Sequence, residues 1–207
     1  MTYGFLDIAV TPSVRAAQAE NNAAQLWENF GGDRAFDRFG PNETAFIQQR
    51  DSFYMASVSE TGWPYVQHRG GPTGFLKVLD DRRLGFADYR GNRQYISLGN
   101  IAADDRVALI LVDYGMRARM KIFARAQALS LDDDPDFTAQ VVDPGYKGRP
   151  ERLFKLTLEA FDWNCPQHIA PRLTAEEFTA AATQLRERIA ELEAENAALR
   201  AELAGRR

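Results

Sequence analysis

Seven short apolar runs occupy the middle of the chain, between about residue 53 and residue 163. They are rich in β-branched and aromatic residues, and turn-like segments at 60–62, 70–72 and 80–81 separate the first four of them. In order, the runs read FYMASVS, WPYVQHR, GFLKVL, RLGFADY, RVALILVDY, RARMKIFARAQAL and RLFKLTLEAFDW. Short strands at this spacing, with few helices between them, favour a mainly β fold, either an antiparallel barrel or a sandwich.

Helix signals flank and interrupt these runs. Thr11 as N-cap and Pro12 at the first helical position predict a helix over residues 12–30 that stops at a Gly-Gly pair, 31–32. Asn42 would cap a short helix over residues 43–50, and Gly91 with Asn92 would open another over residues 91–101. We therefore expect the strands to be accompanied by flanking helices.

The last segment, residues 174–207, has a different pattern. Thr174 and Glu177 fit a capping box, which predicts a helix that runs to about Ala204. The apolar residues of this helix alternate spacings of four and three, which assigns them to heptad positions a and d. Position a holds Ala182, Ile189, Asn196 and Leu203, and position d holds Phe178, Leu185, Leu192 and Leu199. We therefore divide the chain into a globular domain, residues 1–173, and a C-terminal helix, residues 174–207.

Three features favour a parallel dimeric coiled coil for this helix. Ile at a with Leu at d favours two strands, and a lone Asn at an a position sets register and orientation. The flanking charges also agree, because Arg188 would meet Glu193 of the partner subunit and Glu195 would meet Arg200 of the partner subunit. The alternative is a surface helix that packs its apolar stripe on its own globular domain. A basic-zipper protein is excluded, since no basic region precedes the heptads.

The residue composition limits the chemistry that side chains alone can perform. The 207 residues are 45% hydrophobic and 26% charged, as in an ordinary globular protein. Cys165 is the only cysteine, and His68 and His168 are the only histidines. An internal disulfide is therefore excluded, a structural zinc site nearly so, and a Ser-His-Asp triad has few residues to draw on. If the protein is an enzyme, a bound cofactor carries the chemistry, and we expect no metal site.

Charge and hydropathy also bear on partners and location. The formal net charge of -4 argues against a dedicated nucleic-acid binder, which needs a cationic surface. The first residues lack the basic and apolar regions of a secretory signal, and no apolar run approaches the ~20 residues of a spanning helix. We therefore expect a cytoplasmic protein that binds neither nucleic acid nor membrane.

Cationic and amide side chains gather in three places that suit an anionic ligand. They are Arg117, Arg119 and Lys121 on a strand, Asn92, Arg93 and Gln94 at a helix start, and Arg69 with Gly70 and Gly71 at a strand end. The strand residues would share one face, and the helix start offers free N–H groups and the positive end of a dipole. Glycines let a ligand approach the backbone. A solvated strand face or a plain turn would explain each place singly, but together they indicate a phosphate-bearing ligand. The Walker and GxGxxG nucleotide motifs are absent.

Three sequence blocks carry a family resemblance. WPYVQHRGGPTGFLKV, LGFADYRGNRQYISLGNI and RVALILVDYGMRARMKIFARA, in this order, resemble the FMN-binding split barrel of pyridoxamine 5′-phosphate oxidase-like proteins. The resemblance covers about residues 42–165 and implies a homodimer that holds FMN at its subunit interface. It also implies a role for each candidate: Arg69 and Gly70 near the flavin and its ribityl phosphate, Asn92, Arg93 and Gln94 on the phosphate, and Arg119 and Lys121 on the ribityl chain or isoalloxazine ring.

The chain departs from the vitamin B6 oxidases of this family after the last predicted strand. Those proteins end with an arginine–histidine element that grips the substrate phosphate, whereas this region reads FDWNCPQHIAPR, which argues against pyridoxamine phosphate as substrate. Cys165 and His168 in this stretch are candidate catalytic groups, a redox-active thiol and a proton donor, or else they pack and bond to backbone. His68 either contacts the flavin or has only a structural role, as a polar partner at the edge of its strand.

The leading hypothesis from the sequence is an FMN-dependent oxidoreductase that acts on a small molecule. In it, Arg119 and Lys121 would stabilise the anion of reduced flavin. Two alternatives belong to different classes. One is a non-catalytic protein that binds flavin, heme or another cofactor for storage or sensing. The other is a scaffold in which the coiled coil is the functional part and the barrel site is vestigial.

Overall fold

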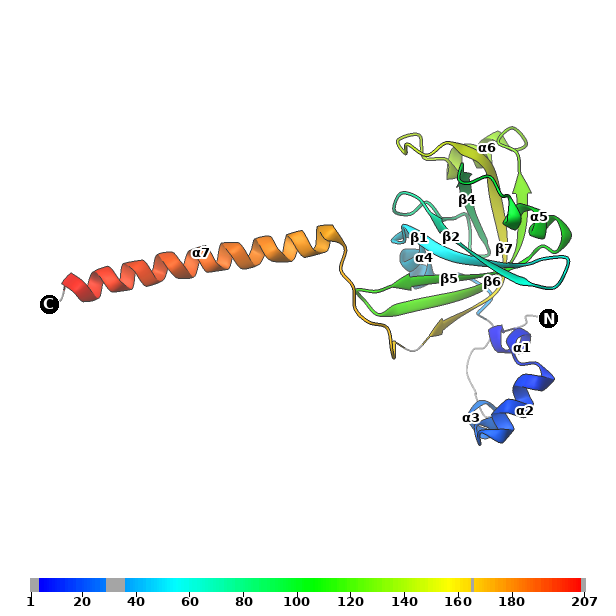
Figure 1. The fold of residues 1–207 in the computed structure, drawn as a ribbon, viewed down its shortest axis with the longest axis horizontal. Helices are drawn as coiled ribbons and strands as arrows, with labels where there is room; N and C mark the ends of the chain where they lie inside the picture. Colours follow the sequence, from blue (N-terminus) through cyan, green and yellow to red (C-terminus); the bar gives the residue numbers. More distant parts are fainter. Residues whose placement is uncertain (1–3, 29–35, 165, 206–207) are drawn as a thin grey trace. The chain divides into compact units, whose positions relative to one another are not determined.

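The seven apolar runs form seven strands of one antiparallel sheet. The computed structural model describes residues 4–28, 36–164 and 166–205. The strands are β1 (Ser52–Val58), β2 (Pro64–Gly70), β3 (Lys77–Val78), β4 (Arg83–Tyr89), β5 (Arg106–Asp113), β6 (Ala118–Leu129) and β7 (Pro150–Asn164). Their order is β2-β1-β5-β6-β7-β4-β3. The sheet curls around a shared core into a split β-barrel, the fold that the resemblance implied (Figure 1).

Alternation along the strands builds this core. In β1, Phe53 and Met55 are buried, and in β6, Met120 and Ile122 are buried, so alternate residues of each strand point into the core. A bulge between Phe123 and Ala124 of β6 interrupts its pairing with β7, and bulges increase the local twist that a closed sheet needs. The result is one core of aliphatic and aromatic side chains inside the barrel, and a second sheet face that points away from it.

The helix predicted over residues 12–30 is wrong in its length. The structure has α2 (Pro12–Glu20) and a separate α3 (Ala24–Glu28). The break falls at Asn22, whose φ of 56° is left-handed, a conformation that ends helices and that Asn tolerates better than most residues. The start is confirmed, because Thr11 Oγ1 accepts a hydrogen bond from the Val14 N–H at 3.4 Å. The expected Gly-Gly stop lies outside the described residues.

Helix α4 (Pro41–Gln48) begins earlier than expected. Its N-cap is Gly40, whose N–H donates to Glu43 Oε2 at 3.0 Å, and Pro41 occupies the first helical position. The prediction that Asn42 caps this helix is therefore wrong. Two short helices were not predicted: α1 (Phe5–Ala9) and α6 (Pro135–Val141). The start of α6 has a readable signal, because the Asp134 carboxylate accepts from the Phe137 N–H at 3.0 Å and a proline follows it.

The chain divides into two compact units, one formed by Met1–Asp113 with Ala118–Gln167 and the other by Tyr114–Arg117 with His168–Arg207. The second unit contains the long helix α7 (Ala175–Gly205). The predicted capping box at its start is confirmed: the Thr174 N–H donates to Glu177 Oε2 at 2.7 Å, and the Glu177 N–H donates to Thr174 Oγ1 at 3.1 Å. Within the described ranges, no helix combines the length and apolar character that crossing a membrane requires.

Candidate functional site

A small polar pocket lies where β2, β4 and β7 meet the segment that leads into α5 (Ile96–Ala103). Its volume is about 50 Å³. The side chains that line it include three arginines, two carboxylates and three uncharged polar groups: Arg69, Arg93, Arg152, Asp88, Glu151, Gln67, Asn92 and Ser97. Three positive against two negative side chains leave one net positive charge, which suits an anionic ligand.

Asp88 holds two of these arginines together. Its carboxylate accepts from Arg152 Nη1 at 3.0 Å and forms a second, shorter ion pair with Arg69 Nη1. Strand geometry explains the meeting, because Asp88 and Arg152 are direct partners across β4 and β7. Arg69 points to the same side as its neighbour in β1, the core residue Phe53, and its guanidinium lies over the Phe154 ring at 5.5 Å. The side chains of this Arg69–Asp88–Arg152 cluster are only 10–16% exposed.

Loss of water dominates the electrostatics of this cluster. Burial raises the pKa of Asp88 above its usual value, although Arg69 and Arg152 act in the opposite direction. Burial also lowers the pKa of Arg69. The ion pairs therefore do not fully offset the desolvation of the charges, as is common for buried pairs. In addition, Arg69 Nε is buried without a hydrogen-bond partner in the part of the chain that the structure describes. Such clusters are enriched at functional sites.

The segment before α5 supplies the mouth of the pocket. The prediction of a helix from residue 91 is wrong here, because Arg93 and Tyr95 have φ values of 63° and 54° and α5 starts only at Ile96. Asn92 stabilises this loop: its Oδ1 accepts from the Gln94 N–H at 3.2 Å and its Nδ2 donates to Gln94 Oε1 at 3.1 Å. Asn92 and Arg93 line the pocket from the loop, and Gln94 follows them without lining it.

Polar contacts brace the walls of the pocket. Ser97, which is buried in the first turn of α5, donates to Gln67 Oε1 of β2 at 2.9 Å. Tyr95 donates to Glu151 Oε2 at 3.3 Å, and the Arg152 guanidinium lies 4.6 Å from the centre of the Tyr95 ring. These contacts tie the loop and the helix to β2 and β7, so the pocket is positioned by neighbouring strands as well as by the loop itself.

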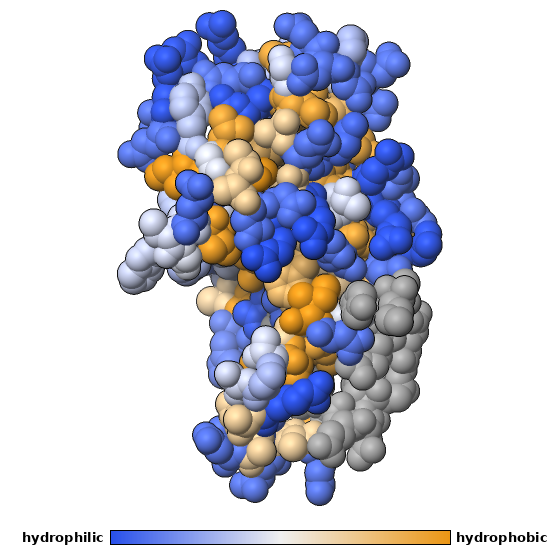
Figure 2. Space-filling model, turned by 90° about the vertical axis from the view of Figure 1, so that its right-hand side faces the viewer, coloured by the Kyte–Doolittle hydropathy of each residue, from blue (hydrophilic) through white to orange (hydrophobic). Residues whose placement is uncertain are grey.

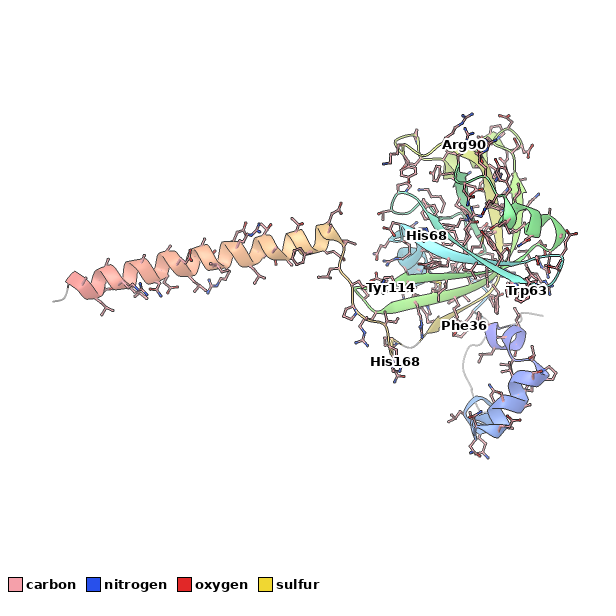
Figure 3. The ribbon with its side chains drawn as sticks, viewed as in Figure 1. Phe36, Trp63, His68, Arg90, Tyr114 and His168 are labelled. Atoms are coloured by element: carbon pink, nitrogen blue, oxygen red, sulfur yellow. The ribbon has the colours of Figure 1, made fainter. Side chains whose placement is uncertain are left out.

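Three of the expected cofactor residues lie elsewhere, on the outer face of the sheet. His68 (labelled in Figure 3) is adjacent to Arg69, but alternation turns it to the opposite side of β2, where its ring forms an edge contact with the Tyr54 ring. The register continues this row across β1, β5 and β6 through His68, Tyr54, Ile110 and Lys121. Arg119 lies on the same face two residues before Lys121. The structure therefore does not bring these three residues together with Arg69 in one chain.

The outer-face cations differ in their contacts. Lys121 Nζ is 2.9 Å from Asp162 Oδ2 and 4.6 Å from the centre of the Phe5 ring. Arg119 Nε is buried without a hydrogen-bond partner among the described residues. The expectation that Arg117 shares their strand face is wrong, because Arg117 precedes β6 with a left-handed φ of 54°.

The two glycines, Gly70 and Gly71, are not among the residues that line the pocket. Gly70 ends β2, where a Cβ atom would come within 3.1 Å of the His68 ring. At Gly71, a Cβ atom would lie 2.6 Å from the Phe75 ring, so packing of that core side chain explains this glycine. Cys165 lies outside the described residues. His168 belongs to the second unit, where it is exposed with a left-handed φ of 63°.

Sequence reasoning missed the carboxylate at the centre of the site. Asp88 is a charged residue within RLGFADY, a strand that is otherwise almost wholly apolar, and that exception was the available signal. Arg152 had no comparable signal, because it belongs to a strand of alternating charged and apolar residues. The described residues contain no group of three or more His, Cys, Asp or Glu side chains that could hold a metal ion. What the pocket offers instead is guanidinium, amide and hydroxyl donors for an anion such as a phosphate.

Comparisons with known proteins agree with this architecture. Residues 39–162 match the family model described as Pyridoxamine 5′-phosphate oxidase. The solved structure of HupZ from Group A Streptococcus is similar with 14% identity and a TM-score of 0.50, over 65% of this chain and 100% of that chain. No curated protein matches the sequence.

Two further solved structures are similar at lower scores. HutZ, a heme storage protein from Vibrio cholerae, has 16% identity and a TM-score of 0.42, over 60% of this chain and 94% of that chain. An FMN-binding protein from Syntrophomonas wolfei has 12% identity and a TM-score of 0.43, over 74% of this chain and 95% of that chain. At such identities these comparisons concern the fold alone.

Proposed function

Because the chain belongs to the pyridoxamine 5′-phosphate oxidase family, whose model spans 124 of its 207 residues, we propose that it is an FMN-binding oxidoreductase acting on a small molecule. The observation that carries this proposal is the Arg69–Asp88–Arg152 cluster beside the loop that holds Asn92 and Arg93. Burying these charged side chains costs desolvation free energy, so a contribution to stability alone does not explain the cluster. Binding of a phosphate ester would explain it, because the guanidinium groups can donate charge-assisted hydrogen bonds to phosphate oxygens.

The residues present fit a phosphate group. Asp88 neutralises one charge and keeps two guanidinium groups side by side, so their remaining N–H groups can donate to phosphate oxygens. Arg93 supplies a third guanidinium from the loop, and Asn92 supplies an amide. The unpaired Nε–H of Arg69 indicates a donor for which the chain itself provides no acceptor among its described residues. Gln94, next in the loop, would orient Asn92.

The size of the pocket indicates that one chain is not sufficient. Pockets for small molecules and cofactors usually measure ~300–1,000 Å³, whereas this one measures about 50 Å³. It can hold the phosphate end of a cofactor but not a flavin ring. We therefore propose that the ring lies between two copies of the chain, against the outer sheet face of the partner.

The outer face has the character that such an interface needs. Around His68, Arg119 and Lys121 it presents exposed apolar side chains, of which Val66 is 60% exposed and Tyr54 is 43% exposed. Near Phe123 and Ala108 the outer sheet face contains a mainly apolar hollow of about 560 Å³. Figure 2 shows apolar patches among the hydrophilic surface on the side of the molecule that it presents. Exposed apolar patches of this kind are typical of interaction sites. In a dimer, His68, Arg119 and Lys121 would reach the cofactor held by the partner's pocket, which one chain does not allow.

Bound FMN supplies hydride exchange with the substrate. The chain would anchor the phosphate through Arg69 and Arg93, and the cations Arg119 and Lys121 would stabilise negative charge on the ring. His168 and Cys165 stay candidates for proton donation and for thiol chemistry at the substrate, and Gly70 for close approach to the cofactor. The region after the last strand does not match the arginine–histidine element with which the vitamin B6 oxidases grip the substrate phosphate. We therefore propose that the substrate is a small molecule other than pyridoxamine phosphate.

The first test is the identity of the bound cofactor. The purified protein should be yellow and should release FMN on denaturation, with an absorption spectrum that distinguishes flavin from heme. Reduction of the bound flavin by NADH or NADPH, followed in stopped flow with reoxidation by oxygen, would then separate an enzyme from a storage or sensing protein. Colourless protein that FMN cannot reconstitute would contradict both flavin functions.

The second test concerns the phosphate anchor. Arg93→Ala removes a charge-assisted hydrogen bond and should weaken FMN binding by roughly 10- to 100-fold, since such bonds contribute about 1.5–3 kcal/mol. Arg90→Ala is the matched control, because Arg90 (labelled in Figure 3) is close in sequence but pairs with Glu151 at 3.5 Å and is not among the residues that line the pocket. The affinity of both variants for FMN is measured by fluorescence titration. Equal affinity of Arg93→Ala and Arg90→Ala would show that Arg93 does not bind the FMN phosphate.

A further inference from the structure

Helix α7 carries an apolar stripe that is exposed within its own unit, as far as the described residues show. The helix is continuous over Ala175–Gly205, and none of its described residues is buried. The six large apolar side chains at its a and d positions are between 46% and 65% exposed, and they are Phe178, Leu185, Ile189, Leu192, Leu199 and Leu203. Long helices in water depend on packing of an apolar face for stability, so this stripe needs a partner.

We propose that α7 pairs with α7 of a second copy of this chain in a parallel, in-register, two-stranded coiled coil. Charge complementarity favours a second copy of this chain as the partner of α7. In the parallel register, Arg188 at position g lies beside Glu193 at position e of the partner subunit, and Glu195 lies beside Arg200 of the partner subunit. By symmetry each contact occurs twice. In the single helix, Arg188 pairs with Glu191 at 2.9 Å, but both side chains are 65% exposed, so this surface pair can readily give way.

Charge alone does not fix the orientation. An antiparallel pair that keeps every apolar layer would place Arg186 beside Glu193 of the partner subunit and Arg188 beside Glu195 of the partner subunit. Opposite charges therefore meet in both orientations.

Asn196 decides between the two orientations. In the parallel register, Asn196 faces Asn196 of the partner subunit, and the two side-chain amides can donate to and accept from each other. In the antiparallel register, a positions face d positions, so each Asn196 would face Leu185 of the partner subunit. That would bury two amides without partners, which is strongly unfavourable. The parallel register is therefore the one that both buries the apolar a and d side chains and gives the Asn196 amide a hydrogen-bond partner.

Disulfide cross-linking in the full chain tests the register. With Cys165→Ser as background, Leu185→Cys and Leu199→Cys place one thiol at a d position, which faces its own copy in the parallel coil. In the antiparallel register the same thiols would be about 16 Å and 25 Å apart along the axis, well beyond the reach of a disulfide. Ala198→Cys, at the outward c position, is the matched control. Under a glutathione redox buffer at low micromolar protein, we expect most of each d-position variant to migrate as a linked dimer.

The outcomes separate the possibilities. Absence of linkage at both d positions, or equal linkage at Ala198→Cys, would overturn the proposal, and the stripe would then belong to an antiparallel pair, to the rest of this chain or to another protein. The result does not depend on flavin, so it stands or fails separately from the proposed function.

A charge exchange gives an independent test of orientation. Glu193→Arg in the Leu199→Cys background should lower the linked fraction severalfold, because Arg188 then meets a like charge from the partner subunit in both contacts. The double exchange Arg188→Glu with Glu193→Arg should restore linkage in the parallel coil. In the antiparallel register the same double exchange would place like charges at both contacts, so a further loss of linkage would overturn the proposal.

Discussion

Asp88 shows how one side chain organises the candidate pocket. It is buried, it bridges two arginines from different strands, and its own pKa is raised by the loss of water. Without its carboxylate, Arg69 and Arg152 would be two buried positive charges in direct repulsion. The pocket therefore depends on a residue that need not touch the ligand itself.

Asp88→Ala should destabilise the protein by about 3 kcal/mol, the cost expected when a buried ion pair loses one partner. The control is Asp81→Ala, which breaks the exposed Arg38–Asp81 pair (2.7 Å, side chains 60% and 51% exposed) and should cost less than ~1 kcal/mol. Urea unfolding of both variants measures the difference, and Asp88→Asn retains an acceptor if the alanine variant does not fold. Equal unfolding midpoints for Asp88→Ala and Asp81→Ala would show that the cluster is not held as described.

Asp104 sets a pH dependence at the residue scale. Hydrogen bonds from the Arg106 side chain and backbone lower the pKa of Asp104 to about 2. A carboxyl whose folded pKa is depressed stabilises the fold above its unfolded pKa of ~4 and loses that contribution as pH falls toward the folded value. The wild type should therefore be more stable than Asp104→Asn at neutral pH, and the difference should shrink between pH 4 and pH 2. Thermal melts across this range check it, and a difference that stays constant with pH would contradict it.

At the scale of elements, helix α6 depends on close approach to strand β4. A Cβ atom on Gly85 would lie 2.5 Å from the Phe137 ring and 3.0 Å from Val141, so the glycine is what lets these α6 side chains pack on the strand. Phe137 and Val141 form a satellite core with Ala87 and Leu153, next to the strands that carry Asp88 and Arg152.

Gly85→Ala should destabilise the protein by about 1–3 kcal/mol through overpacking. Gly99→Ala is the matched control, because no heavy atom of the described residues, apart from its chain neighbours and the nearby backbone of α5, lies within 4 Å of a Cβ at Gly99, and its place in α5 favours alanine by up to about 1 kcal/mol. The two variants should move the unfolding midpoint in opposite directions. A shift of the same sign for both would indicate that α6 can move away from β4 at little cost.

At the scale of the whole molecule, the proposal of a site shared by two chains predicts coupling between an exposed surface and flavin affinity. Val66→Arg places a charge on the outer sheet face, 60% exposed in the single chain, without disturbing its core. We expect flavin affinity to fall at least ~10-fold, equivalent to about 1.4 kcal/mol. Pairing of α7 would keep two chains together regardless, so flavin titration, rather than mass, is the measurement.

Val14→Arg on α2 introduces the same change at another exposed valine and should leave affinity unchanged. If Val66→Arg binds FMN as tightly as Val14→Arg, the cofactor does not lie against the outer sheet face.

The sequence by itself determined the local features of this protein. Short apolar runs bounded by turn residues identified all seven strands, and the heptads and the Thr174 capping box identified α7, because each of these patterns arises from neighbours within a few residues. Alternation also separates His68 from Arg69, because consecutive residues of a strand point to opposite faces. Helix ends were less predictable, since left-handed Asn22, Arg93 and Tyr95 break helical periodicity without a glycine.

Only the tertiary structure decided which side chains meet. Arg69, Asp88 and Arg152 come from three strands, and their contact depends on the pairing of β4 with β7 and on the curl of the sheet, neither of which is encoded in any one segment. The same closure separates the pocket cations from Arg119 and Lys121, which share the outer face with His68. A charge becomes part of a site when folding removes its water and supplies a partner, and both conditions depend on contacts between residues far apart in the chain.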